Sequence, residues 1–74
     1  MTIEEYRIML GWSKQQLAEA SEIDITTLYN ALDPQKRIYK ATAGKIAYGI
    51  NKGLKERNLP HISYTDLDNL RFAD

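Results

Sequence analysis

The chain is 74 residues long, with ten basic and ten acidic side chains, so its formal net charge is zero. It contains no cysteine, which excludes disulfides, thiolate metal sites and cysteine nucleophiles, and no apolar run approaches the roughly 20 residues that a membrane span requires. We therefore expect one small domain covering residues 1–74, in a soluble protein of the cytoplasm.

Cap signals mark the first two helices. Thr2 stands three residues before Glu5, and Ser13 stands three residues before Gln16, which is the spacing of a capping box. Gly11, between them, is expected to end the first helix in a left-handed conformation. The predicted helices cover residues 3–10 and 14–21.

A third helix is predicted over residues 25–32. Asp24 is its expected N-cap, and Pro34 disfavours helical geometry at the residue before it, which ends the helix. At about 100° per residue, one face of this helix is apolar and centred on Leu28. The opposite face carries Thr26, Thr27, Tyr29 and Asn30.

The second half of the chain is predicted to form one long helix and one short helix. Apolar residues at helical spacing after Thr42 predict a helix over 43–57, and Ser63 with Asp66 repeats the capping spacing ahead of a helix over 64–70. The stretches "RIYKAT" and "PHISYT" lack a hairpin partner and are expected to be loops. The predicted fold is all-α, a compact bundle of four or five helices.

Three glycines lie within the predicted fourth helix, where each costs about 1 kcal/mol relative to alanine. They either permit close packing or leave the helix partly frayed, in which case a homodimer could complete it. The apolar side chains of the tail could serve the same dimer, or could simply cover the core of their own chain. The residues concerned are Gly44, Gly49 and Gly53 in the helix, and Ile62, Tyr64, Leu67, Leu70 and Phe72 in the tail.

Charge is distributed unevenly along the chain. Residues 1–33 hold two basic and six acidic side chains (net −4), residues 34–57 hold seven and one (net +6), and residues 58–74 hold one and three (net −2). A net charge of zero argues against a nucleic-acid partner, because such domains are usually basic. The basic block, which includes the loop "PQKRIYK", argues for one unless it is only a solvated surface. Tyr39 in this loop is expected to be a core aromatic, with a phosphate contact as the alternative.

The segment "WSKQQLAEASEIDITTLYNAL" resembles the helix-turn-helix of Cro-type phage repressors, the xenobiotic-response-element family. The resemblance implies a lambda-repressor-like bundle in which the second helix braces the third and the third enters the major groove of DNA. It also implies that Ala18 lets these helices cross closely, that Leu28 plugs the space beneath them, and that a homodimer binds paired half-sites. The matching positions are Ser13, Gln16, Leu17, Ala18, Ile23, Thr27 and Leu28.

Side-chain chemistry and the resemblance together imply a set of DNA contacts. Threonine methyls contact thymine, asparagine can bond adenine through two atoms, and tyrosine hydroxyls reach phosphates or base edges. Cations in the loop after the third helix are expected to neutralise phosphates. The expected contacts are Ile25, Thr26, Tyr29 and Asn30 with base edges, and Lys14, Thr27, Lys36, Arg37 and Lys40 with the backbone.

The sequence departs from the family pattern at the turn. Glu22 stands where the family usually has glycine, and a left-handed backbone there costs roughly 1 kcal/mol. We therefore expect either a reshaped turn or a longer second helix. Lys14 replaces a frequent glutamine but keeps a phosphate donor. The cations of the fourth helix, Lys45, Lys52 and Lys55, are expected to face solvent.

No catalytic site, cofactor or metal site is expected. His61 is the only histidine, and no carboxylate stands at a spacing typical of an acid–base pair. There is no glycine-rich phosphate loop, no metal-ligand spacing and no sign of a small-molecule substrate. Double-stranded DNA is the expected partner. The alternative is a helical protein-interaction module, antitoxin-like or adaptor-like, which binds protein through the same face and which the zero net charge favours.

Overall fold

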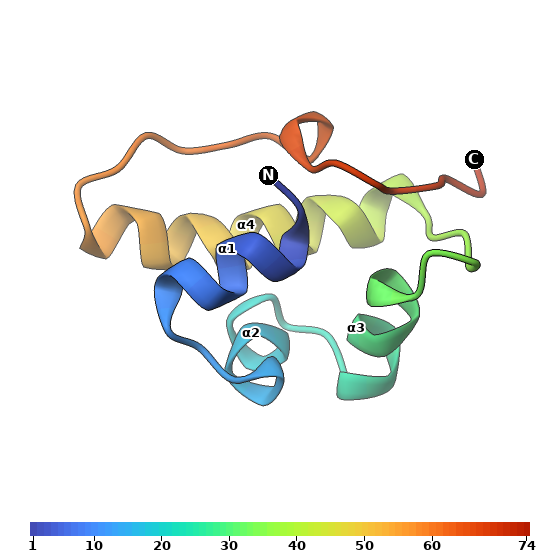
Figure 1. Ribbon diagram of the computed structural model, residues 1–74, viewed down its shortest axis with the longest axis horizontal. Coiled ribbons are helices and arrows are strands. Elements are labelled where there is room, and N and C mark those ends of the chain that lie inside the picture. The colour runs from blue at the N-terminus through green and yellow to red at the C-terminus, as the bar shows by residue number, and fades with distance from the viewer.

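The computed structural model describes residues 1–74 and is all-helical, as expected (Figure 1). The longest helix runs the length of the molecule, with the other three in front of it and below it and the C-terminal tail above it in this view. None of the helices has the length and apolar character needed to cross a membrane. The elements are α1 (Ile3–Leu10), α2 (Lys14–Ala20), α3 (Ile25–Leu32), α4 (Lys40–Glu56) and the single 3₁₀ turn η1 (Tyr64–Asp66).

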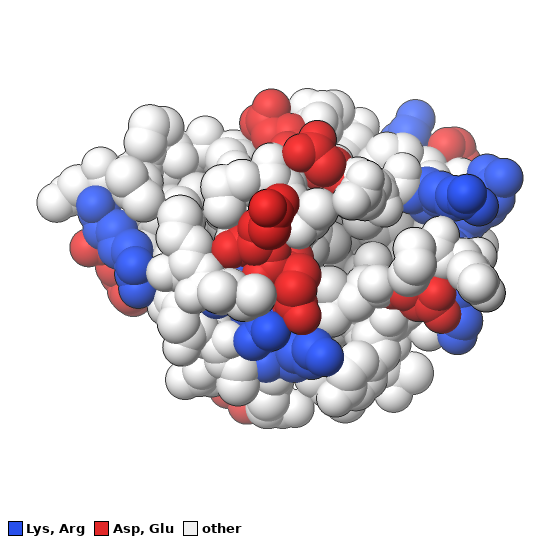
Figure 2. All heavy atoms as spheres, viewed as in Figure 1, with Lys and Arg blue, Asp and Glu red and all other residues white.

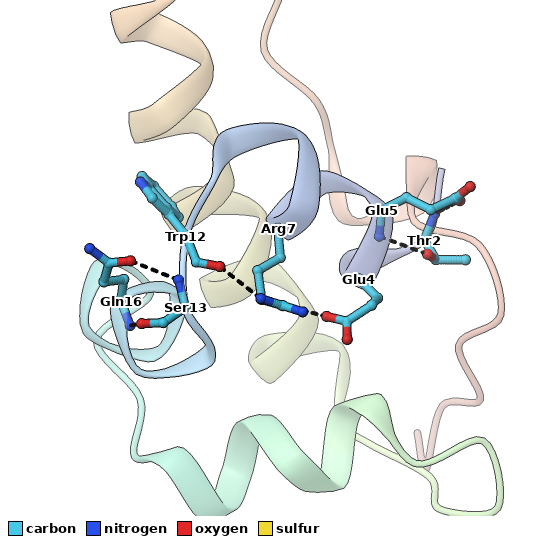
Figure 3. Close-up of polar contacts among 7 residues, drawn as sticks. All are labelled: Thr2, Glu4, Glu5, Arg7, Trp12, Ser13 and Gln16. Carbon is cyan, nitrogen blue, oxygen red and sulfur yellow. Dashed lines mark hydrogen bonds and ion pairs between the residues drawn. The ribbon is translucent and has the colours of Figure 1, made fainter.

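Two capping boxes start α1 and α2, as the sequence predicts (Figure 3). The Glu5 N–H donates to Thr2 Oγ1 at 3.1 Å, and the Thr2 N–H donates to Glu5 Oε1 at 2.8 Å. The Gln16 N–H donates to Ser13 Oγ at 3.1 Å, and the Ser13 N–H donates to Gln16 Oε1 at 2.7 Å. Each box satisfies backbone donors that a helix start otherwise leaves unpaired.

Arg7 connects the end of α1 to the start of α2 (Figure 3). Its Nη1 donates to the carbonyl oxygen of Trp12 at 2.8 Å, while its Nε donates to the carboxylate of Glu4. The hydrogen bond and the charge of Arg7 hold the pKa of Glu4 below its ordinary value. Between the two helices, Gly11 has a φ of 70°, which confirms the predicted left-handed cap.

Helix α4 begins earlier than predicted, at Lys40 rather than residue 43. Its N-cap, Tyr39, makes no side-chain cap bond, and the Lys40 N–H instead donates to Asp74 Oδ1 at 3.0 Å. The acceptor for this N–H at the start of α4 thus comes from the far end of the chain, and no local residue spacing predicts it. Tyr39 is 63% exposed, so the expectation that it joins the core was wrong.

The predicted helix over residues 64–70 was also wrong, because the tail forms only η1. Isolated parallel bridges pair Thr2 with Asp68 and Ile38 with Phe72. The Ile38 N–H donates to the Arg71 carbonyl oxygen at 2.8 Å. Backbone groups after η1 therefore find partners in distant segments, and the chain is extended there.

The tail covers the core of its own chain. Leu67 is buried, and Ile62, Leu70 and Phe72 pack against the core. Asn51 of α4 holds the tail in place, since its side chain accepts from the Ile62 N–H at 2.8 Å and donates to the Ile62 carbonyl oxygen at 2.9 Å. Of the two expectations for these apolar residues, coverage of the single core is the one observed.

Two of the three α4 glycines permit close packing, and α4 is one continuous helix, so fraying was the wrong alternative. A Cβ at Gly49 would lie 2.7 and 2.8 Å from backbone atoms of Ser21, at the end of α2. A Cβ at Gly53 would lie 2.8 Å from side-chain carbons of Leu10. Gly44 meets nothing within 4 Å, so packing does not explain it.

Candidate nucleic-acid interface

The candidate interface is built on α3, which one buried face anchors to the bundle. Leu28 has no exposed surface, and Ala31 is 8% exposed. Ala18 of α2 is 1% exposed, as expected for a small residue at a helix crossing. The remaining face of α3 is therefore turned outward in a fixed orientation.

The turn between α2 and α3 keeps a left-handed residue although it has no glycine. Glu22 has a φ of 57°. The Ile23 N–H donates to the Ala18 carbonyl oxygen, and the Glu22 N–H donates to that of Glu19, both at 3.1 Å, which are the two bonds of a Schellman motif. The expectations of a reshaped turn or a longer α2 were therefore both wrong. The two hydrogen bonds offset the steric cost of a left-handed conformation at Glu22, which is roughly 1 kcal/mol.

The N-terminus of α3 is capped by Asp24. Its Oδ1 accepts from the Thr27 N–H at 2.7 Å. Hydrogen bonding by the Thr27 side chain and backbone lowers the pKa of Asp24, so its carboxylate stays charged. This negative charge interacts favourably with the positive, N-terminal end of the helix dipole. It also adds an acidic group close to the outward face.

The outward face of α3 carries three of the four side chains expected at base edges. Thr26 is exposed, Tyr29 is 52% exposed, and Asn30 is half-buried. Ile25 does not join them, because its half-buried side chain packs against the core with the other apolar residues of α3. The face available for a partner is therefore polar.

A lysine from α2 contacts one side chain of this face. The Nζ of Lys14 is 5.5 Å from the centroid of the Tyr29 ring, within the range of a cation–π interaction. Lys14 is half-buried, and Thr27 beside the cap is half-buried too. The contact brings a cation and an aromatic ring from two different helices together.

A second lysine approaches from the loop after α3. The Nζ of Lys36 donates to Asn30 Oδ1 at 3.0 Å. Asp33 shapes the loop, since its Oδ1 accepts from the Gln35 N–H at 2.9 Å and its carbonyl oxygen accepts from the Lys36 N–H at 3.1 Å. Residues 30 and 36 meet across a turn, so helical periodicity does not predict their contact.

Of the other two expected cations, Arg37 lies towards the tail, and Lys40 is the first residue of α4. Arg37 Nη1 donates to the Phe72 carbonyl oxygen at 3.3 Å, and the Lys40 backbone bonds Asp74. Figure 2 shows basic side chains gathered at the end of the molecule that holds this loop and the C-terminus. Exposed Tyr39 stands between these cations, and only the structure revealed its exposure.

Charges elsewhere are arranged differently. In Figure 2, acidic side chains form a band across the middle of the visible face, over α1, and a further group near η1. Lys45, Lys52 and Lys55 of α4 are exposed, as expected, and the Nζ of Lys52 lies 4.5 Å from the centroid of the Tyr48 ring. The visible face is mixed in sign, with local basic regions.

His61 is exposed in the segment after α4, and no group of three or more His, Cys, Asp or Glu side chains is arranged to hold a metal ion. The features that distinguish α3 are its polar outward face and the two lysines that contact it, Lys14 at Tyr29 and Lys36 at Asn30. No family model matches the chain, and no similar curated protein or solved structure was found.

Proposed function

We propose that the protein binds double-stranded DNA in a sequence-specific manner, with α3 in the major groove, as a small repressor-like transcriptional regulator of the cytoplasm. One observation carries the proposal. Two lysines from different elements contact the polar outward face of α3, Lys14 at the Tyr29 ring and Lys36 at the Asn30 amide.

This arrangement suits the shape of DNA. A helix in the major groove faces base edges along its centre and phosphates on both sides. Side chains at the centre of the α3 face, Thr26 and Asn30, can make hydrogen bonds and methyl contacts with bases. The ammonium groups of Lys14 and Lys36 can neutralise phosphates. A merely solvated helix would more often carry Glu, Lys or Ala on its exposed face, because Thr and Asn are weaker helix formers.

The proposal includes a weak homodimer on a palindromic site, because two-fold dimers read paired half-sites. The apolar tail packs on the core of its own chain, so a dimer is not needed to cover that core. Sedimentation should detect dimers on a duplex with two half-sites. A protein that stays monomeric there and at high concentration contradicts this part of the proposal.

A protein-interaction module, antitoxin-like or adaptor-like, is the second candidate. The observation that favours it is the formal net charge of zero, together with the acidic band over α1. A salt titration of binding to mixed-sequence duplex separates the two. DNA binding should give log affinity falling with log salt by about 0.9 for each phosphate neutralised. Absence of duplex binding at low salt favours the protein-interaction module.

Sequence specificity is tested by selecting bound duplexes from a random pool and by two variants. Asn30→Ala should lose about 1–3 kcal/mol of discrimination at one base pair while leaving the affinity for random duplex nearly unchanged. Arg37→Ala should weaken specific and random duplexes alike and reduce the salt slope by about one unit. Circular dichroism must show both variants folded. An unchanged ratio of specific to random affinity in Asn30→Ala means that this face does not read bases.

A further inference from the structure

The contact between Lys36 and Asn30 decides which way the Asn30 amide points. An ammonium group has donors and no acceptor, so it can bond only the amide oxygen. Lys36 Nζ donates to Asn30 Oδ1 at 3.0 Å. The Asn30 amino group, Nδ2, is therefore left as the free end of the amide, and it can only donate.

This orientation changes what the pair can recognise. An asparagine that bonds adenine must accept from the N6 amino group through Oδ1 and donate to N7 through Nδ2. In this structure Asn30 Oδ1 already accepts a hydrogen bond from the positively charged ammonium group of Lys36. To donate to the same oxygen, the adenine N6 amino group would have to lie beside that positive charge, which disfavours adenine.

Guanine is the base whose major-groove edge offers two acceptors, N7 and O6. We propose that Asn30 and Lys36 act as one unit that reads guanine, with Asn30 Nδ2 and Lys36 Nζ both donating to its edge. This inference rests on the proposed function and replaces the expectation that Asn30 alone bonds adenine. Lys36 is thereby a specificity-determining residue as well as a phosphate neighbour.

The fold prepares this pair before any DNA is present. Asp33 holds the turn through bonds to the backbone N–H groups of Gln35 and Lys36, and Asn30 is half-buried on α3. A side chain that is already oriented loses less conformational entropy on binding than a free one. The reduction in this entropy cost is largest for Lys36, because its long side chain is exposed.

The test is base selection from a random duplex pool with four forms of the protein. Wild type should select guanine over adenine at one position of the site by roughly 5- to 150-fold, the range of one good base contact. Lys36→Met keeps the length of the side chain but removes the donors. It should therefore free Asn30 Oδ1 and move the preference at that position to adenine.

Two further variants serve as controls. Lys36→Arg keeps donors at this point of the loop and should keep guanine. Arg37→Met removes the neighbouring cation, which bonds the Phe72 carbonyl oxygen rather than Asn30, so it should weaken all duplexes without changing the selected base. Circular dichroism checks that each form is folded.

The outcomes separate this inference from the function on which it rests. Enrichment of adenine by wild type, or of guanine by Lys36→Met, overturns the proposal that Asn30 and Lys36 recognise guanine together. It leaves the proposal of sequence-specific DNA binding intact. A pool with no enrichment for any folded form overturns the proposed function, and the base preference with it. The side-chain amide resonances of Asn30 report the contact without DNA. They should shift between wild type and Lys36→Met, and unchanged resonances overturn the pairing itself.

Discussion

The N-terminal region, residues 1–33, and the C-terminal tail, residues 57–74, contain the same capping signal with different outcomes. The boxes at Thr2 and Ser13 each start a full helix, whereas the box at Ser63 starts a single 3₁₀ turn. After the first two boxes, apolar residues at helical spacing can pack against α4. After the third, the chain pairs with distant backbone at Thr2 and Ile38. A cap starts a helix, but packing decides how far the helix continues.

The two regions are also buried to different extents. The end of α2 packs directly on Gly49, and the end of α1 packs on Gly53. In the tail only Leu67 is buried, and hydrogen bonds from Asn51 and short backbone bridges support it. We therefore expect the tail to open at a lower free energy than the N-terminal region.

The largest expected effect tests the close contact of α2 with α4. Gly49→Ala should reduce the free energy of unfolding by about 3 kcal/mol, because the new Cβ meets the Ser21 backbone, which cannot move without shifting α2. Gly44→Ala is the matched control, since its Cβ meets open space. It should raise stability by up to about 1 kcal/mol. Urea denaturation measures both, and equal effects of the two variants would rule out the close contact.

The next effect tests the attachment of the tail. Asn51→Ala leaves the N–H and carbonyl of Ile62 without their partners and should cost about 2 kcal/mol. Amide hydrogen exchange should show faster exchange in the tail and little change in α2 and α3. Lys52→Ala, an exposed neighbour on α4, should leave both regions unchanged. A uniform loss of protection across the molecule in Asn51→Ala contradicts the separate opening of the tail.

A smaller effect compares the capping boxes directly. Ser13→Ala should cost about 1 kcal/mol, because α2 depends on its cap and packs on α4. Ser63→Ala should cost only a few tenths of that, since its box supports one turn and its Oγ lies 3.4 Å from the Thr65 N–H. Thermal unfolding of the two variants gives the comparison. A larger loss for Ser63→Ala would show that the tail, too, depends on its cap.

The smallest effect is the pH dependence of the α3 cap. Because the pKa of Asp24 is lowered from its ordinary value of 3.8, its contribution to stability is complete above that value. It is lost as the pH falls through the lowered pKa, where the folded protein takes up the proton. The difference in stability between wild type and Asp24→Asn should therefore shrink on acidification below about pH 4. A difference that grows on acidification contradicts the assigned direction.

Much of the N-terminal region follows from the sequence alone. The caps at Thr2, Ser13 and Asp24 predict the starts of α1, α2 and α3, because each cap bond joins residues only three apart. The polar outward face of α3 follows from helical periodicity for the same reason. Periodicity also shows the apolar side of α3, on which Ile25 packs against the core.

The rest depends on contacts between residues far apart in the chain. Asp74 meets the start of α4, Phe72 pairs with Ile38, and Lys36 reaches Asn30 across a turn. Local spacing carries no information about such meetings, since they exist only once the helices have packed and the tail has crossed them. The sequence by itself determined where α1, α2 and α3 begin and which face of α3 is polar. Only the tertiary structure decided where the tail lies and which atoms the loop cations bond, because packing sets the positions of those partners.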